Sequence, residues 1–339
     1  MATPAEPILA SEIGHSRVND TSNAKSPLGM PPSRPRRLRF ENKTLDSAFE
    51  GGLGYQSVHC IVSEPDNGAS ELVHALIASH LRSFLEARAT VIDSTLSFDV
   101  RRLFTILGDG EAGKDGAMKM LGRLDIMKVF DYVGLTEAVA ELRDVLEGKQ
   151  ESGQPNLQPA AKTFPSTIED SEEDEDEMLD DIPPAGNEKP QPAPALADTA
   201  EEQPAVRLLI VNNISQLMMP QVKNNYTHGQ ALIATFMRSL QHLTQSHNIC
   251  TVLLSNTANK PAKDDEKLSL FKSCALRPAL GLGFGYLVDV QTYLHKLPIK
   301  RQSTELAHVL EIVQDRESGR FGRWAAFTCD ADGRLRDLP

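Results

Sequence analysis

The stretch VHCIVSEPDNGASELVHALIASHL, Val58 to Leu81, decides the fold. Its first residues, VHCIV, are apolar and rich in β-branched side chains, which is typical of a buried strand. After the loop SEPDNGAS, apolar residues recur at helical spacing and predict an amphipathic helix. We expect Phe84 and Leu85 to continue the apolar face of that helix. A strand, a tight loop and a helix in this order are where a phosphate-binding loop of the form G-x-x-x-x-G-K-[ST] would lie.

The loop keeps part of that phosphate-binding pattern. Gly68 and Ser70 match its second glycine and its hydroxyl, while Ser63 and Ala69 stand where it has the first glycine and the lysine. Backbone amides of such a loop can still cradle a phosphate. The candidate nucleotide-binding residues in this loop are Ser63, Glu64, Pro65, Asp66, Asn67, Gly68, Ala69 and Ser70. This stretch by itself leaves open a degenerate ATPase loop and an ordinary strand, turn and helix.

Charge divides the chain into segments. The net charge of the 339 residues is −12. Residues 151–204 hold 15 acidic residues and two lysines, a net of −13, so the rest carries about +1. An acidic, proline-rich segment cannot bury a core. We therefore expect a disordered tail at 1–39, a disordered insert at 148–204, and one domain built from 40–147 and 205–339.

The rest of the chain alternates strand-like and helix-like segments. ATVIDS (89–94) predicts a second short strand. The runs VRLLIVNNI (206–214) and NICTVLLSN (248–256) are apolar enough for strands buried on both faces, and helical patterns lie between the strands. Three further strand-like runs close the chain, and we expect antiparallel strands there to extend one edge. The predicted class is α/β, with a central, largely parallel sheet and helices on both faces.

Cysteine and apolar usage exclude several classes of protein. Cys60, Cys250, Cys274 and Cys329 are far apart and form no C-x-x-C pair. This spacing argues against a disulfide framework or a metal site and indicates a reducing, intracellular compartment. Cys60 and Cys250 lie in predicted strands, where we expect them to be small buried apolar residues. No apolar run is long enough to span a membrane, so no membrane partner is expected.

Several stretches, taken in order, resemble the RecA-type ATPase core of the eukaryotic strand-exchange recombinases, the Rad-fifty-one family. The resemblance covers roughly residues 40–146 and 206–335, and the RPALG piece (277–281) is most similar to the D-type paralogue. The stretches are LDSAFEGGLGYQSVHCIVSEPDNGAS, VIDSTLSFDVRRL, VRLLIVNNISQL, SLQHLTQSHNICTVLLSN and RPALGLGFGYLVDVQTYLHK. The resemblance implies a RecA-like core, and this family hydrolyses ATP between neighbouring subunits on single-stranded DNA.

The chain departs from the family at four functional positions. Ala69 replaces the lysine that faces the β- and γ-phosphates, and Asn212 replaces the aspartate that organises the magnesium shell. Thr95 aligns with the glutamate that activates water, and Thr257 aligns with the glutamine that senses the γ-phosphate. Losing the lysine alone removes a charge-assisted hydrogen bond of roughly 1.5–3 kcal/mol. We therefore expect weak binding of ATP and magnesium, with Asn212 as a ninth candidate binding residue, and no catalytic residue.

The resemblance also predicts where DNA and partners would bind. The loop after the fourth core strand, 257–277, approaches DNA in the family. Its cations are Lys260, Lys263, Lys267, Lys272 and Arg277. Phe271 is its one aromatic residue, which predicts little stacking capacity. The four arginines in SRPRRLRF (33–40) can form a nuclear import signal, a nucleic-acid contact or a solvated charge cluster. We expect a nuclear protein.

Three hypotheses about function remain open at this stage. The first is a non-catalytic recombinase paralogue that joins related chains in a hetero-oligomer supporting homologous recombination and double-strand-break repair, with DNA bound directly or through the partner. The second is an active DNA-dependent ATPase whose site a partner completes. The third is an unrelated α/β binding module. The family's docking motif, F-x-x-A before the core, is not evident in RFENKT (39–44), and its letters recur at Phe84–Ala87, where we expect a core helix.

Overall fold

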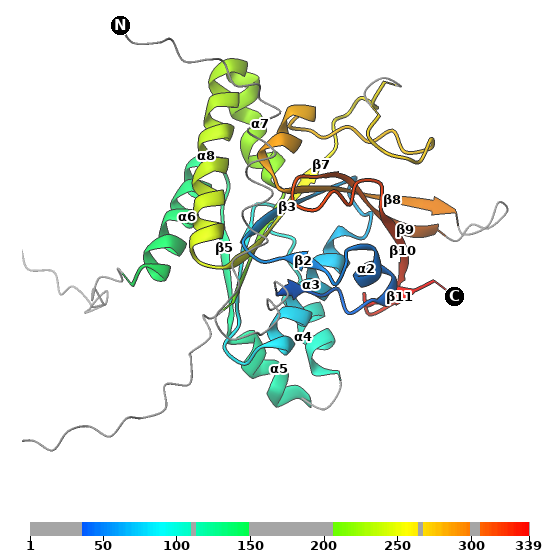
Figure 1. Cartoon of the computed structure of the whole chain (residues 1–339). Coiled ribbons are helices and arrows are strands. Elements are labelled where there is room, and N and C mark those ends of the chain that lie inside the picture. Colours follow the sequence, from blue (N-terminus) through cyan, green and yellow to red (C-terminus); the bar gives the residue numbers. More distant parts are fainter. Residues whose placement is uncertain (1–35, 110–112, 149–205, 264–266, 299–305, 339) are drawn as a thin grey trace, which may run out of the picture.

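The computed structural model describes residues 36–109, 113–148, 206–263, 267–298 and 306–338 (Figure 1). The expected insert at 148–204, except for Gly148, and the tail up to residue 35 lie outside these ranges. The end of the expected tail belongs to the domain, which corrects the prediction for residues 36–39. Strand β1 (Arg37–Leu38) pairs with β2 (Leu53–Gly54), and the side chains of Leu38 and Phe40 are buried in the core. Burial of these apolar side chains holds this segment against the domain.

One sheet of nine described strands crosses the domain in the order β11-β10-β9-β8-β3-β7-β6-β4-β5. The run from β8 to β5 is parallel, whereas β9, β10 and β11 are antiparallel and extend one edge as expected. The strands are β3 (Ser57–Ser63), β4 (Arg88–Asp93), β5 (Leu124–Lys128), β6 (Arg207–Asn212), β7 (Ile249–Asn256), β8 (Val290–Pro298), β9 (Leu306–Asp315), β10 (Trp324–Cys329) and β11 (Leu335–Asp337).

Helices cover both faces of this sheet (Figure 1). One apolar core lies beneath α2 (Lys43–Ala48), α3 (Ala69–Ser83), α4 (Val100–Gly108) and α5 (Gly113–Leu121). The other lies beneath α6 (Tyr132–Leu146), α7 (Ile214–Asn224), α8 (Tyr226–Ser246) and the 3-10 helix η2 (Leu282–Leu287). The predicted α/β class with a largely parallel sheet is confirmed. None of the described helices is long and apolar enough to cross a membrane.

The end of α3 corrects two sequence predictions. The helix ends at Ser83, and Phe84 has extended backbone, so Phe84 and Leu85 do not continue its apolar face. Leu85 is 89% exposed. The Phe84 ring instead packs edge-on against Tyr55 and His80. The letters F-x-x-A at Phe84–Ala87 therefore lie in the connection between α3 and β4, not on a core helix.

Cysteine burial follows the prediction. Cys60 and Cys250 are fully buried in β3 and β7, and the four cysteines are free thiols. Burial raises the pKa of the Cys60 thiol to about 12, which makes it inert at neutral pH. These two residues are packing groups of the central strands.

Candidate functional site

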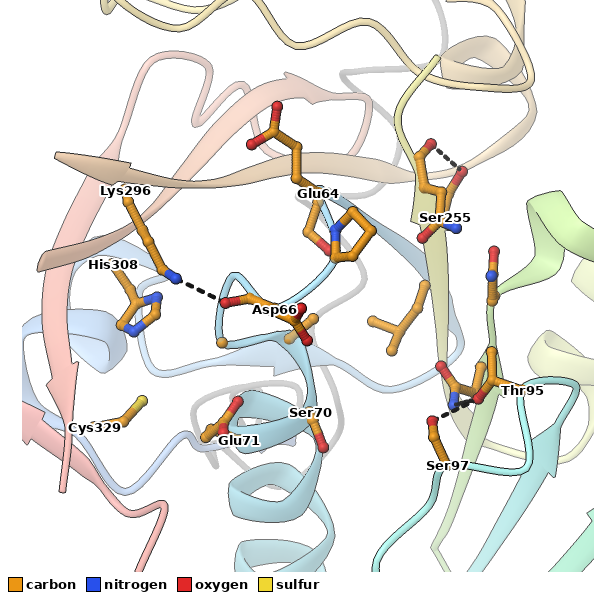
Figure 2. Close-up of a pocket in the computed structure, with 18 of the residues that line it drawn as sticks. Glu64, Asp66, Ser70, Glu71, Thr95, Ser97, Ser255, Lys296, His308 and Cys329 are labelled. Atoms are coloured by element: carbon orange, nitrogen blue, oxygen red, sulfur yellow. Dashed lines mark hydrogen bonds between the residues drawn. The ribbon is translucent and has the colours of Figure 1, made fainter. Parts of the chain in front are cut away.

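A cavity of about 620 Å³ opens where the parallel strands end (Figure 2). In a parallel sheet the carboxyl ends of neighbouring strands meet at one edge, and ligands of open α/β sheets bind there. The last residues of β3, β6 and β7, Ser63, Asn212 and Asn256, all line this cavity. Eight of the nine candidate residues line it: Ser63, Glu64, Pro65, Asp66, Gly68, Ala69, Ser70 and Asn212. We call this space the loop cavity.

The loop between β3 and α3 is supported from the side by two other strands. Lys296 of β8 donates from Nζ to the Asp66 carbonyl at 2.7 Å (Figure 2). His308 of β9 has its Nδ1 2.9 Å from the carbonyl oxygen of the ninth candidate, Asn67. Gly68 has a φ of +85°, and a Cβ there would come within 2.7 Å of the His308 ring. Glycine is therefore required at this position by both backbone conformation and space.

The charges that line the loop cavity do not favour a triphosphate. Three carboxyl side chains, Glu64, Asp66 and Glu71, face two cations, Arg102 and Lys296. Arg102 is paired with Glu71 at 2.8 Å, and the Lys296 ammonium is held on a loop carbonyl. Because Ala69 supplies no charge where the phosphate-loop pattern has lysine, the lining has an excess of one negative charge.

Hydrogen bonds between side chains link the carboxyl ends of β4 and β6. Asn212 donates from Nδ2 to Asp93 Oδ1 and to Thr95 Oγ1, both at 2.9 Å. Asp93 also accepts from the Thr95 backbone and hydroxyl at 3.0 and 2.8 Å, and from the Phe98 amide at 3.1 Å. Burial acts to raise the pKa of Asp93, but these hydrogen bonds hold it below its usual value.

Asp93 was missed by sequence reasoning, although an acidic residue at the end of a buried strand is a signal that could have found it. Its carboxylate is 2% exposed and engaged by four hydrogen bonds. The amide of Asn212 acts as a donor here, which an aspartate could not do at neutral pH. Over the described ranges, no cluster of three or more His, Cys, Asp and Glu side chains suits a metal ion.

Ser70 and Thr95 line the loop cavity, and Thr257 lies outside it. Ser70 lines it from the first turn of α3. Thr95 also lines it, with its hydroxyl 2.7 Å from that of Ser97 (Figure 2). Thr257 lines a neighbouring cavity of about 430 Å³ that shares Glu64 and Lys296 with the loop cavity. The structure therefore brings the phosphate-loop, Asn212 and Thr95 positions together and leaves Thr257 in the adjacent space.

The loop of 257–277 is tied to the sheet by a buried acid. Glu311 of β9, 0% exposed, accepts from Ser269 Oγ at 2.5 Å and from the Leu270 amide at 2.6 Å. Of the five candidate DNA-contact cations, Lys260, Lys263 and Lys272 are exposed and Lys267 and Arg277 are partly buried. Arg277 lines the neighbouring cavity. The cations lie along one loop and do not enter the loop cavity.

Phosphoryl transfer needs particular groups around the phosphates. Catalysis of that reaction depends on cations against the phosphates, a carboxylate-bound metal and a residue that positions the nucleophile. Ala69, Asn212 and Thr95 line the loop cavity with a methyl, an amide and a hydroxyl group, none of which is a cation, a carboxylate or a base at neutral pH. No protein-family model and no curated protein matches the chain.

Proposed function

We propose that the chain is a non-catalytic paralogue of the RecA-like strand-exchange recombinases, acting as an adaptor in a hetero-oligomer that supports homologous recombination and double-strand-break repair in the nucleus. The observation that carries the proposal is the Asn212 amide bridging Asp93 and Thr95. This bridge lies at the carboxyl ends of β4 and β6, where a magnesium-dependent ATPase would keep a carboxylate free to bind the metal. The strand order, with the loop-bearing β3 in the middle of a largely parallel sheet, supports a RecA-like core.

The net negative lining of the loop cavity supports the same reading. In a working ATPase, cationic side chains of the protein pair with the phosphates of the substrate. Here the Arg102 guanidinium pairs with Glu71, and the Lys296 ammonium supports the loop backbone. Residual binding of ATP through the loop amides is weak in this proposal, and nucleotide turnover is not part of the function.

The adaptor reading needs a surface for a partner, and the β5 edge offers one. Within the described sheet β5 pairs with β4 alone, so its outer backbone groups are open to a further strand. Ile126, Phe130 and Val133 are exposed on β5 and just beyond it, to 36%, 73% and 56%. An open strand edge with apolar side chains is a template for pairing with another chain.

The proposal is tested by tagged capture of the full chain from nuclease-treated cell extract, with bound proteins identified by mass spectrometry. Recombinase-family proteins should be captured without DNA as a bridge. The double variant Phe130→Ser, Val133→Ser should lose them. Tyr286→Ser, which alters an aromatic residue that is 71% exposed on η2, is the matched control and should retain them. If no such protein is captured before or after DNA damage, the recombination function is wrong.

A second candidate, an ATPase completed by a partner, is favoured by Gly68 and Ser70, which keep their places at the loop cavity. ATP turnover should be measured on the captured complex. Turnover that is abolished by Ser70→Ala in this chain would favour the second candidate over the adaptor. Absent turnover, with the complex intact, is the result expected for an adaptor.

A further inference from the structure

Two arginines lie side by side at the amino end of the central sheet. Arg88 is the first residue of β4 and Arg207 is the first residue of β6, and the two are register partners in this parallel pair of strands. Neighbouring strands are about 4.8 Å apart, and residues opposite each other point to the same face. Arg88 is exposed and Arg207 is partly buried. We call these two residues the arginine pair.

The described part of the domain supplies no carboxylate in contact with the arginine pair. Among the described residues, neither guanidinium group has an ion-pair or hydrogen-bond partner. Burial and then the charge of Arg88 lower the pKa of Arg207, and the Asp125 carboxylate acts in the opposite direction. Like charges directly opposite each other in a sheet are destabilising. An anion bound between the two guanidinium groups would therefore stabilise this end of the sheet.

The course of the chain brings an anionic segment to this place. Because β5, β4 and β6 are parallel, helix α6, which follows β5, returns the chain towards the amino ends of the strands. The acidic segment 151–204 comes after α6, and the chain rejoins the described domain at Val206, the residue before Arg207. With its net charge of −13, the most acidic part of the chain is covalently attached beside the arginine pair.

We propose that the acidic run EDSEEDEDEMLDD, residues 169–181, docks on the arginine pair and covers the amino end of β4 and β6. Ten of the thirteen residues of this run are acidic. Pairs of guanidinium and carboxylate groups form charge-assisted hydrogen bonds that are often bidentate. The proposal goes beyond the adaptor function and does not depend on it.

An exposed leucine beside the arginine pair favours this run over the other acidic residues of the segment. Leu85 lies three residues before Arg88 and is 89% exposed. Its backbone is held, because Arg123 donates to the Leu85 carbonyl at 2.8 Å. The run carries Met178 and Leu179 among its acidic residues. A surface that combines two cations with an apolar side chain is thus matched by a run that combines carboxylates with apolar side chains.

The length of the connection allows this docking. Asp181 and Val206 are 25 positions apart. A chain of that length spans up to about 80 Å when extended, which is far more than the separation of neighbouring strands. A segment of the same chain meets its site at an effective concentration of about 1 mM. Ion pairs that are individually weak at an exposed site can therefore keep the run bound.

The test uses a fluorescein-labelled peptide of residues 169–181 and the full-length protein in two forms. The first form is the unaltered chain. In the second, the amide form, the ten acidic residues of the run are replaced by Gln and Asn, so that the run cannot compete. The amide form should bind the peptide, measured by anisotropy, at least about ten-fold more tightly than the unaltered chain, whose own run occupies the site. Raising the salt concentration from about 0.05 to about 0.5 M should weaken this binding.

Variants of the amide form locate the site. The double variant Arg88→Glu, Arg207→Glu should weaken peptide binding by at least about ten-fold. The double variant Arg101→Glu, Arg238→Glu changes the net charge equally at two exposed arginines on α4 and α8, and it should bind as the amide form does. Leu85→Ser should weaken binding by about three- to ten-fold. Circular dichroism confirms folding, and glutamine at both positions of the arginine pair replaces the charge reversal if that variant does not fold.

Four results would overturn the proposal. The first is absent or equal binding of the peptide by the amide form and the unaltered chain. The second is equal weakening by the two double variants, which would indicate general charge attraction. The third is a thymidine oligonucleotide that displaces the peptide and binds the unaltered chain as tightly as the amide form, which would assign the arginine pair to nucleic acid. The fourth is self-association of the unaltered chain that the amide form lacks, which would assign the run to a second copy of the chain.

Discussion

Replacing Asn212 with aspartate removes the hydrogen-bond donor that binds the Asp93 carboxylate. Asn212 Nδ2 lies 2.9 Å from Asp93 Oδ1, so an aspartate would place two carboxylates against each other. One hydrogen bond to a charged group, of roughly 1.5–3 kcal/mol, is lost. Two unit charges about 4 Å apart repel by about 4 kcal/mol at an effective dielectric constant of about 20. The pair can instead take up one proton, which at neutral pH costs about 4 kcal/mol.

We therefore expect Asn212→Asp to lower the free energy of unfolding by about 3–4 kcal/mol at neutral pH. The sign of the pH dependence follows from linkage. The repelled carboxyl has a raised pKa in the folded state, so the folded variant binds more protons than the unfolded chain. Its stability deficit relative to the unaltered protein should shrink as the pH falls from about 7 to about 5. Millimolar Mg²⁺ should also reduce the deficit if the two carboxylates can share an ion.

Urea unfolding at several pH values, with and without Mg²⁺, measures both effects. Asn256→Asp is the matched control, because Asn256 lines the same cavity and no described hydrogen bond joins its side chain to Asp93. The reasoning is refuted if the two variants lose equal stability, or if the deficit of Asn212→Asp is the same at all pH values. Equal losses would mean that the bridge to Asp93 adds no particular stability, and a deficit independent of pH would mean that the two carboxylates do not repel each other.

Three further predictions concern the loop and a buried histidine. Ala69→Lys should tighten binding of a fluorescent ATP analogue by about ten- to a hundred-fold over Ala69→Gln, because it restores a charge-assisted hydrogen bond to phosphate; equal affinities would show that the loop does not cradle phosphate. Gly68→Ala should lower stability by about 1–3 kcal/mol in thermal unfolding, because its φ is +85° and its Cβ would meet the His308 ring, whereas Gly283→Ala, with open space, should not. Burial lowers the pKa of His59 to about 4, so the unfolded chain binds the extra proton and stability should fall by up to about 3 kcal/mol as the pH drops from about 6.5 to 4; His59→Gln should flatten this slope, and an unchanged slope would contradict the assignment.

Local pattern was sufficient for much of the fold. The apolar runs at 58–62, 89–94, 206–214 and 248–256 predicted strands of a largely parallel sheet, and β3, β4, β6 and β7 lie there. Pattern was less reliable at the ends of elements. The apolar periodicity of α3 continued to Leu85, but the chain leaves the helix at Ser83, so tertiary packing ended the helix before its pattern did.

The candidate site was likewise predictable from the sequence only in part. The sequence placed Gly68 and Ser70 at a turn between a strand and a helix, and the turn chemistry is local. It could not show that Lys296 and His308 support this loop, because these contacts join residues about 230 and 241 positions apart. Nor could it show that Asn212 acts as a donor to Asp93, because the orientation of an amide depends on the partners that the fold brings to it.

The sequence by itself determined the α/β class, the buried central strands and the residue types, such as Ala69 and Asn212, that line the loop cavity. These properties follow from residue type and from spacing along the chain. Only the tertiary structure decided which partners Asn212, Lys296 and His308 meet. Asn212 of β6 reaches Asp93 of β4, across strands that are neighbours in the sheet but distant in the chain. Such contacts depend on strand order, which no local pattern encodes.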